Sequence, residues 1–255
     1  MATVQTLTEP YGAFLIHPLA NGTGVCEVCH AATPAAYNRC YACNEAVNEF
    51  PDGVADAVVP ISISIKREQF ATELWRYKEI EDRDAKRILQ LRLAAVLWRF
   101  LTGHEQCVAG AAGVEAFDVV TMVPSTGGRQ RHPLREIAGE VVGATRGRFV
   151  DLLKANPDIP TDRRVHADRF TVLDGEESVE VAGASVLVID DTWTRGGHAQ
   201  SASVALKAAG ARRVAIVVLG RHFDPDYAPN GTYLQQAREA RFSWEHCCVH
   251  QEGLW

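Results

Sequence analysis

The sequence predicts an α/β protein in which a parallel sheet is flanked by helices and preceded by a small four-cysteine module. Two continuous apolar runs, at 184–189 and 213–219, have the composition of strands that are covered on both faces. A helical stretch from about His198 to Ala209, stopped by Gly210, separates them. Strand, helix and strand in this order form a β-α-β unit. Two C-x2-C pairs in the first fifth of the chain indicate the separate module.

Composition excludes several classes of protein. The 255 residues include 26 Lys and Arg against 32 Asp and Glu, which gives a formal charge of −6 and argues against a generally basic nucleic-acid coat. A hydrophobic content of 47% supplies a full core, so disorder is not expected. Apolar stretches such as 214–219 are too short to cross a bilayer, and no Lys or Arg precedes Arg39 as a secretory signal would require. We therefore expect a cytoplasmic protein without a membrane partner.

The first cysteines form a candidate zinc site. Cys26 with Cys29 and Cys40 with Cys43 are two C-x2-C pairs, and each pair directs two sulfurs toward one centre. The segment around them has few large apolar residues, so a metal would replace the missing core. The alternatives are unligated thiols or two disulfides. Four cysteines leave no open position, so the expected role of Zn2+ is structural. A turn-rich junction predicts a zinc-ribbon-like module at 1–52 and a main domain at 53–255.

The main domain is predicted to open with a strand and a helical region. Residues 58–65 alternate as in a half-buried strand, and Pro60 indicates an edge strand or a strand start. From 68 to 101, apolar residues recur at three- and four-residue steps, and Gly103 is the expected stop. The charges at 79–87 indicate a solvated face or a break between two helices.

A first candidate anion site follows a predicted strand at 117–123. Pro133 is expected to open the next helix, which runs to about residue 144. The loop between them offers hydroxyls, glycine backbone and cations, which are the groups that hold an anion at a helix N-terminus. The alternative is an ordinary exposed turn. The candidate binding residues are Ser125, Thr126, Gly127, Arg129 and Arg131.

A second candidate site follows the strand at 184–189. Asp190 and Asp191 come directly after it, where parallel sheets place their ligands. Carboxylates accept hydrogen bonds from ribose hydroxyls, and backbone N–H groups of a glycine-rich turn hold a phosphate, so this pattern suits a sugar phosphate. A polar turn that caps the next helix is the alternative. The remaining candidate residues are Thr192, Thr194, Arg195, Gly196 and Gly197, and the G-x4-G-K-[ST] pattern of a P-loop is absent.

The run V-L-V-I-D-D-T-W-T-R-G-G resembles the phosphoribosyl pyrophosphate (PRPP) signature of type I phosphoribosyltransferases. Together with the C-x2-C pairs, the order of motifs resembles the ComF family of competence-associated phosphoribosyltransferase-like proteins. The resemblance implies a type I phosphoribosyltransferase-like sheet in which Asp190 and Asp191 hold the ribose hydroxyls. It further implies that Thr194, Gly196 and Gly197 wrap the 5′-phosphate, and that the 125–131 loop holds pyrophosphate.

Two residues depart from the family signature, because Arg195 and His198 replace threonines. Arg195 would either add a phosphate contact or disturb the tight turn. The resemblance implies Mg2+-bound PRPP, transfer of the phosphoribosyl group to an unknown nitrogen acceptor, and release of pyrophosphate. The alternative is an inactive binding or regulatory protein of the same fold, or a competence-associated factor for DNA uptake. Competence or DNA-processing proteins and a second copy of the chain are further candidate partners.

Three remaining features carry weaker expectations. Lys78 ends the W-R-Y-K run on a predicted helix. The family resemblance implies that it could reach pyrophosphate, but we expect it on a solvated face. The basic segment 162–169 is expected to be a flexible surface loop rather than a lid or a nucleic-acid contact. His246, Cys247, Cys248 and His250 lack the usual spacing of a zinc knuckle and are expected to be buried or incidental, and Cys107 is expected to be a small core residue.

Overall fold

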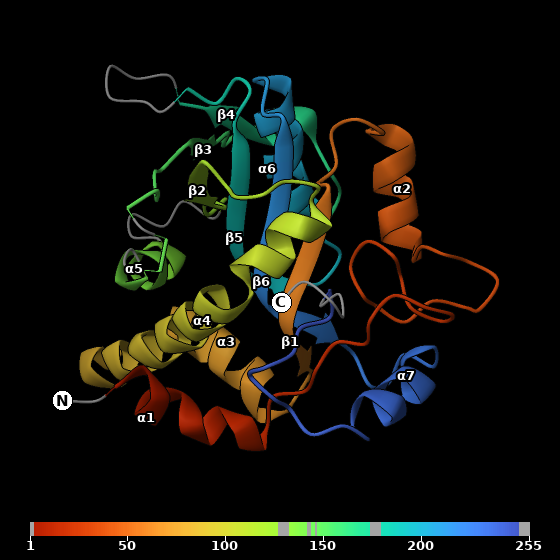
Figure 1. Ribbon diagram of the computed structural model, residues 1–255, viewed down its shortest axis with the longest axis vertical. Coiled ribbons are helices and arrows are strands. Elements are labelled where there is room, and N and C mark those ends of the chain that lie inside the picture. Colours follow the sequence, from red (N-terminus) through yellow and green to blue (C-terminus); the bar gives the residue numbers. More distant parts are fainter. Residues whose placement is uncertain (1–2, 127–132, 142–143, 146, 174–179, 250–255) are drawn as a thin grey trace.

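A parallel sheet forms the centre of the protein. The computed structural model describes residues 3–126, 133–141, 144–145, 147–173 and 180–249 (Figure 1). The strand order is β1-β6-β5-β2, and each neighbouring pair is parallel. The strands are β1 (Ala57–Ile65), β2 (Val119–Met122), β5 (Ser185–Trp193) and β6 (Arg213–Phe223). The predicted α/β fold with a parallel sheet is confirmed.

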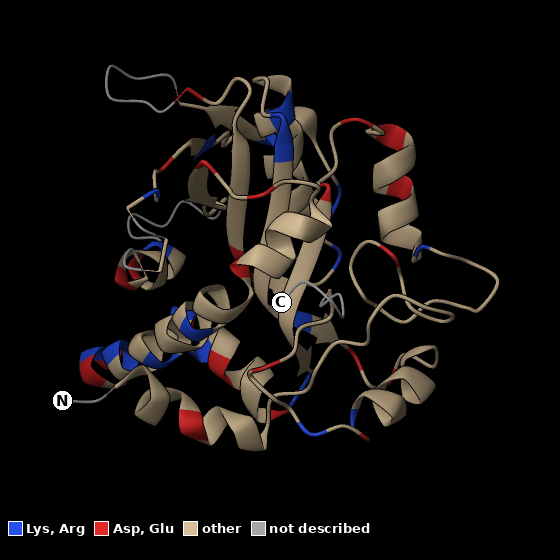
Figure 2. Cartoon of the chain, in the orientation of Figure 1, with Lys and Arg blue, Asp and Glu red and all other residues tan. Residues whose placement is uncertain are grey.

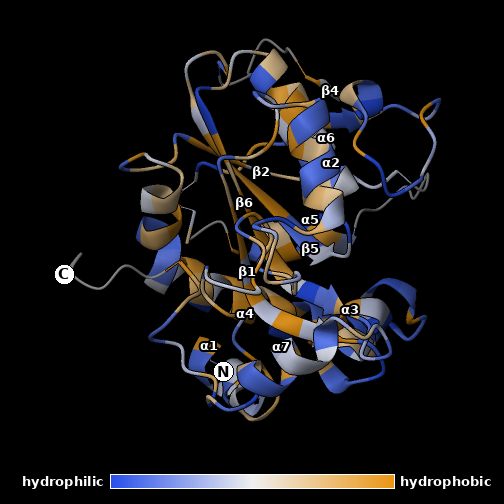
Figure 3. Ribbon diagram, turned by 90° about the vertical axis from the view of Figure 1, so that its right-hand side faces the viewer, coloured by the Kyte–Doolittle hydropathy of each residue, from blue (hydrophilic) through white to orange (hydrophobic). Residues whose placement is uncertain are grey.

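Helices cover both faces of the sheet. On one face lie α3 (Gln69–Glu79), α4 (Arg83–Ala111) and α5 (Pro133–Glu140); on the other lies α6 (Gly197–Ala208). Strand residues alternate between the two cores, so that Leu187 and Ile189 pack toward α4 while Val186 and Val188 pack toward α6. Figure 3 shows the corresponding concentration of hydrophobic residues along the strands. The sheet is therefore doubly covered, as the apolar runs predict.

Smaller elements complete the chain. An antiparallel ribbon of β3 (Leu153–Ala155) and β4 (Phe170–Val172) lies beside the sheet, and α6 contacts β4. The N-terminal α1 (Val4–Thr8) packs on α4. The other elements are the 3-10 helices at Glu9–Ala13 and Ala167–Arg169, α2 (Tyr41–Glu49) and α7 (Asn230–Ala237).

The helical region after β1 consists of two helices. The break predicted in the charged stretch is confirmed at 80–82, where the Asp82 side chain caps α4 by accepting a hydrogen bond from the Ala85 N–H at 2.8 Å. The predicted stop at Gly103 is wrong, because α4 continues to Ala111. Buried side chains at His104, Cys107 and Val108 extend its apolar face beyond Gly103.

The ends of several strands and helices, and the burial of β1, also differ from the prediction. β5 and β6 continue to Trp193 and Phe223, well past the expected ends at 189 and 219, and α5 stops at Glu140. β1 is an edge strand, as Pro60 indicates. It is nevertheless buried at every position, whereas its alternating pattern predicts a half-buried strand. Tyr11 and Leu15 pack in the core cluster on one face of β1, the buried cysteines pack in the cluster on its other face, and the Ile16 carbonyl accepts from the Ile63 N–H, which explains the burial.

The four-cysteine segment packs against the main sheet. Cys26, Cys29 and Cys43 belong to the same hydrophobic cluster as α6. The Tyr233 hydroxyl on α7 donates a hydrogen bond to the His30 carbonyl at 2.6 Å, which ties the segment to the C-terminal part of the chain. The domain boundary at residue 52 stays a prediction.

Charged residues lie mainly outside the sheet. Figure 2 shows acidic and basic residues interspersed over helices and loops, with the centres of the strands uncharged. Among the helices in the described part of the chain, none is long and apolar enough to cross a bilayer.

Candidate active site

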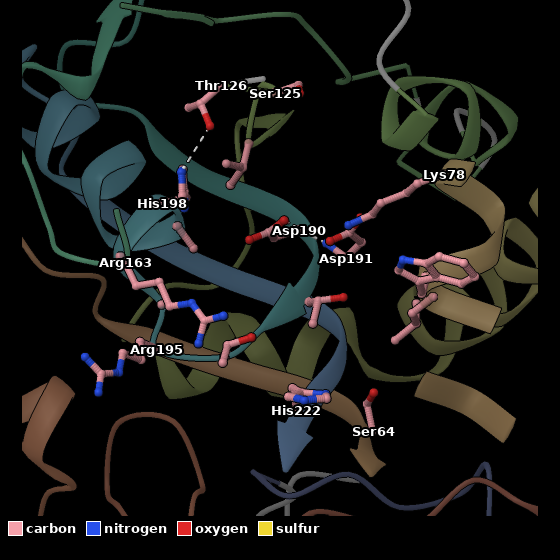
Figure 4. Close-up of a pocket in the computed structure, with 18 of the residues that line it drawn as sticks. Ser64, Lys78, Ser125, Thr126, Arg163, Asp190, Asp191, Arg195, His198 and His222 are labelled. Atoms are coloured by element: carbon pink, nitrogen blue, oxygen red, sulfur yellow. Dashed lines mark hydrogen bonds and ion pairs between the residues drawn. The ribbon is translucent and has the colours of Figure 1, made fainter. Parts of the chain in front are cut away.

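A cavity of about 510 Å³ lies at the carboxyl ends of the parallel strands (Figure 4). β1 contributes Ser64, β6 contributes His222, and β5 contributes the two adjacent acids. Because all four strands are parallel, their carboxyl ends meet at one edge of the sheet, where α/β proteins bind ligands.

Most of the predicted site residues line this one cavity. They are Ser125, Thr126, Asp190, Asp191, Thr192, Thr194, Arg195, Gly196 and Gly197. The loop after β2 and the loop after β5 are 64 or more residues apart in the sequence. The structure therefore brings together two groups of residues that the sequence predicts as separate candidate sites. Gly127, Arg129 and Arg131 lie outside the described residues.

The acid pair stands at the end of β5 and inside its pairing with β6. Asp191 is 7% exposed, its Oδ2 accepts a hydrogen bond from the Tyr77 hydroxyl, and it lies 2.6 Å from the Lys78 Nζ. Asp190 is half-buried, and its Oδ1 accepts from the Asp191 N–H at 2.8 Å. Burial and the neighbouring Asp191 charge raise the pKa of Asp190 to about 8, although Lys78 opposes the shift. The pair thus presents one stabilised carboxylate beside one carboxyl group that resists ionisation.

Lys78 is a site residue that sequence reasoning placed on a solvated face. Its side chain is 30% exposed and reaches from α3 over the acid pair, where it lines the cavity (Figure 4). The exposed residues in the W-R-Y-K run are instead Trp75, at 64%, and Arg76. Tyr77 and Lys78 both contact Asp191, and only the packing of α3 against the sheet reveals these contacts.

The turn after β5 requires its two glycines. Gly196 has a left-handed φ of +79°, and an added Cβ there would overlap the Trp193 ring. A Cβ on Gly197 would overlap the carbonyl group of Arg163. α6 begins at Gly197 without a side-chain cap, so its first N–H groups are free to bind an anion. Arg195 is exposed and lines the cavity, so its bulk lies outside the tight turn (Figure 4).

His198, the second departure from the signature, joins the two loops. Its Nε2 lies 3.1 Å from the Thr126 Oγ1 and 3.2 Å from the Arg169 Nη1. Burial, and then the Arg169 charge, lower the pKa of His198 to about 4, so the imidazole is neutral at pH 7. Because the guanidinium can only donate, Nε2 is an acceptor and the ring proton resides on Nδ1. The histidine therefore connects the two loops without adding charge.

Arg169 anchors the basic segment 162–169. It is fully buried, and its guanidinium donates to the carbonyl oxygens of Pro160 at 2.8 Å and Arg164 at 3.0 Å. This brings Arg163 into the lining of the cavity. Residues 161–164 are exposed, as expected for a surface loop, but the buried Arg169 donates to the Ser201 hydroxyl and ties the segment to α6. The flexibility of the loop stays a prediction.

We expect Asp190→Asn to stabilise the protein increasingly as pH rises. An aspartate side chain ordinarily has a pKa of 3.8, and the folded-state pKa of Asp190 is about 8, so the folded protein holds one more proton between these values. The free energy of unfolding of the wild type must then fall as pH rises through this window, whereas the amide has no proton to lose. Urea unfolding should show the difference in the free energy of unfolding between variant and wild type widening by at least about 1.4 kcal/mol from pH 5 to pH 9, the equivalent of one pKa unit. The control Asp52→Asn replaces an exposed carboxylate, and its difference from the wild type should not widen with pH. A difference that stays constant with pH for Asp190→Asn would contradict the raised pKa of Asp190.

The four N-terminal cysteines form a cluster that fits a metal ion. Their sulfur atoms lie within 4.8 Å of one another, and Cys29 and Cys40 are 3.7 Å apart. A tetrahedral site with Zn–S bonds of about 2.3 Å has sulfur-to-sulfur edges of about 3.8 Å. All four cysteines are unbridged, and Cys26, Cys29 and Cys43 are buried. The cluster can bind a metal such as zinc, in agreement with the prediction from the C-x2-C spacing.

Arg221 connects the cysteine cluster to the glycine turn. Its Nη1 donates to the carbonyl oxygens of Trp193 at 3.0 Å and Thr194 at 3.1 Å, and its Nη2 lies 3.6 Å from the Cys29 sulfur. Burial disfavours the cation, but the nearby thiol groups outweigh it and raise the pKa of Arg221. A zinc ion with four thiolates carries a net charge of −2, which a buried arginine would offset. The sequence analysis did not identify Arg221, because no local pattern connects it with Cys29 or with the glycine turn.

Comparisons with known proteins give limited similarity. No protein-family model matches the sequence. No curated protein matches it. Among solved structures, the chain is similar to the allosteric regulatory enzyme of purine biosynthesis, at 23% identity and a TM-score of 0.30. That match covers 48% of this chain and 25% of the other, so this chain spans about a quarter of the length of that protein.

Proposed function

We propose that the cavity binds PRPP with Mg2+ and that the protein transfers the phosphoribosyl group to a nitrogen acceptor with release of pyrophosphate. The observation that carries the proposal is the pair Asp190 and Asp191 directly before a tight glycine turn at an uncapped helix N-terminus. Carboxylates bind vicinal hydroxyls, and the turn binds a phosphate at a short distance from them. The resemblance to the ComF family, a type I phosphoribosyltransferase-like family, supports the same assignment.

We assign each part of PRPP to a different group of residues in the cavity. In the proposed complex the two carboxylates accept from the ribose hydroxyls, and the N–H groups at 194–197 hold the 5′-phosphate. Lys78 reaches toward the pyrophosphate from the opposite wall. Mg2+ would neutralise pyrophosphate charge, with ligands drawn from substrate oxygens, waters and the carboxylates, which suits its preference for oxygen. Positioning and charge stabilisation supply the catalysis.

A second cavity gives the acceptor room to approach. It measures about 1320 Å³ and lies against the cysteine segment. The lining residues that it shares with the first cavity are Arg163, Thr194, Arg195 and His222. Three exposed tyrosines line it as well: Tyr37, Tyr41 and Tyr227, at 65%, 74% and 61% exposure. We assign the acceptor to this side, where aromatic faces would hold a planar nitrogen compound.

Calorimetric titration of PRPP, with and without Mg2+, tests the binding step. We expect saturable binding that Mg2+ strengthens, and weaker binding of ribose 5-phosphate, which lacks the pyrophosphate. Pyrophosphate release in the presence of ammonia or amines then tests transfer. Binding without release for any acceptor would overturn the transfer reaction and leave a binding or regulatory protein. Absence of PRPP binding would overturn both parts.

A further inference from the structure

A second group of metal-ligating side chains lies on the α4 side of the protein. His104 and Cys107 are on α4, and Cys247 comes from the C-terminal segment. One ligand atom from each lies within 4.8 Å of the other two. These three residues line neither cavity, so the proposed phosphoribosyl site makes no use of them.

The helix and one backbone carbonyl orient the imidazole. His104 and Cys107 are three residues apart, which places them on one face of α4. The His104 Nε2 lies 3.0 Å from the carbonyl oxygen of Trp244, and because a carbonyl only accepts, Nε2 carries the proton. Nδ1 is then the unprotonated nitrogen, and it lies 3.9 Å from the Cys107 sulfur. A second ring nitrogen held by a carbonyl group is the usual arrangement of a metal-binding histidine.

We propose that His104, Cys107 and Cys247 form a second metal site that binds Zn2+. One imidazole and two thiols are donors that zinc prefers, and the lack of oxygen donors among them disfavours Mg2+ and Ca2+. In a tetrahedral zinc site, nitrogen and sulfur ligands are about 3.6 Å apart, so a shift of a few tenths of an ångström would bring His104 and Cys107 to this spacing. The Cys247 sulfur, which lies within 4.8 Å of the other two donor atoms, would move by about 1 Å at most. His104 is 3% exposed and Cys107 7% exposed, so the α4 side of the site is shielded from water, whereas Cys247 is half-buried. Three protein donors leave one position for a further ligand.

This ion would fasten the C-terminal segment to α4. The segment already packs there through Trp244, whose ring lies 4.6 Å from the Arg99 guanidinium carbon and at 5.0 Å, edge-on, from the Phe242 ring. Two further imidazoles belong to the same region. The His17 ring stacks on the Phe242 ring at 4.4 Å and its Nε2 accepts a hydrogen bond from the Ser243 N–H at 2.9 Å, and His246 adjoins Cys247 in the sequence. The vicinity of the three donors is therefore rich in imidazole, and His246 is the nearest candidate in sequence for the fourth ligand.

Metal analysis of the purified protein tests the second site. We expect two zinc ions per chain in the wild type, and one after either Cys26→Ser with Cys40→Ser or Cys107→Ser with Cys247→Ser. Cys248→Ser is the matched control, since this buried thiol adjoins Cys247 and lies outside the three-donor group; it should retain both ions. A single wild-type ion that disappears with the Cys26 and Cys40 substitutions would overturn the proposal.

Two measurements on the wild type remain decisive if a variant fails to fold. Co2+ added to metal-free protein should give thiolate charge-transfer absorption that saturates at two equivalents. Saturation at one equivalent would overturn the second site. Thiol titration after denaturation and chelation should find all seven cysteines reactive. A count of five, with a peptide that links Cys107 to Cys247, would replace the metal site with a disulfide. Neither measurement involves PRPP, so failure of the phosphoribosyl assignment would not affect them.

Discussion

The double substitution Asp190→Asn with Asp191→Asn should abolish measurable PRPP binding while the protein stays folded. Both acidic side chains are expected to accept hydrogen bonds from ribose hydroxyls, and the positive charge of the bound Mg2+ would favour the ionised form of Asp190 in the complex. Charge-assisted bonds of this kind contribute about 1.5–3 kcal/mol each. Loss of two such bonds lowers the affinity by more than about 100-fold. The amides keep the shape of the side chains, and the Asp190 substitution removes a buried group that resists ionisation. Calorimetry with Mg2+ present measures the effect.

The matched control removes the same charge elsewhere. Asp158 and Asp168 are exposed and do not line either cavity, so Asp158→Asn with Asp168→Asn should leave PRPP binding unchanged. Zinc content and the thermal midpoint should stay close to wild type in both double variants. Unchanged binding in the Asp190 and Asp191 variant would contradict the site assignment, whereas equal losses in both variants would indicate a general charge effect.

The β-α-β unit was predictable because its information is local. An unbroken apolar run identifies a strand covered on both faces, and a glycine after the helical stretch marks where it stops. The strand ends were not predictable in this way. Asp190 and Thr192 look like loop residues, yet they pair with Val218 and Gly220 of β6. Parallel pairing continues through the polar residues because the neighbouring strand supplies the hydrogen bonds, whatever the side chains are.

The parts of the site that escaped prediction depend on contacts between distant residues. Tyr77 and Asp191 are 114 positions apart, and Arg221 and Cys29 are 192 apart. Neither pair leaves a spacing pattern in a single sequence. The cysteine pairs were predictable because each C-x2-C turn presents two ligands by itself. The W-R-Y-K run offered only a weak indication for Lys78, because a lysine on a helix is usually solvated.

Cys26→Ser with Cys40→Ser should remove the zinc of the N-terminal cluster and loosen the first fifth of the chain. Each substitution takes one sulfur from a different C-x2-C pair, so neither pair can complete a four-thiolate site. Because the segment has few large apolar side chains of its own, the loss of the metal should expose it to proteases. Limited proteolysis should cut first between residues 18 and 50, with the remainder resistant. Retention of the ion, or an unchanged cleavage pattern, would contradict this role for the cluster.

The same variant should also weaken PRPP binding, although none of the cysteines lines the first cavity. Arg221 donates to the Trp193 and Thr194 carbonyl oxygens at the start of the phosphate-binding turn, and the thiols beside it favour its charged form. Without the thiolate cluster, this buried cation loses its main compensating charge, and the turn that it holds should lose rigidity. We expect an affinity loss of several-fold, far smaller than that of the acid-pair variant. Cys248→Ser leaves the cluster intact and should bind PRPP like the wild type. A loss of PRPP affinity that is confined to the cluster variant would support Arg221 as the positioning residue between the cysteine cluster and the phosphate-binding turn.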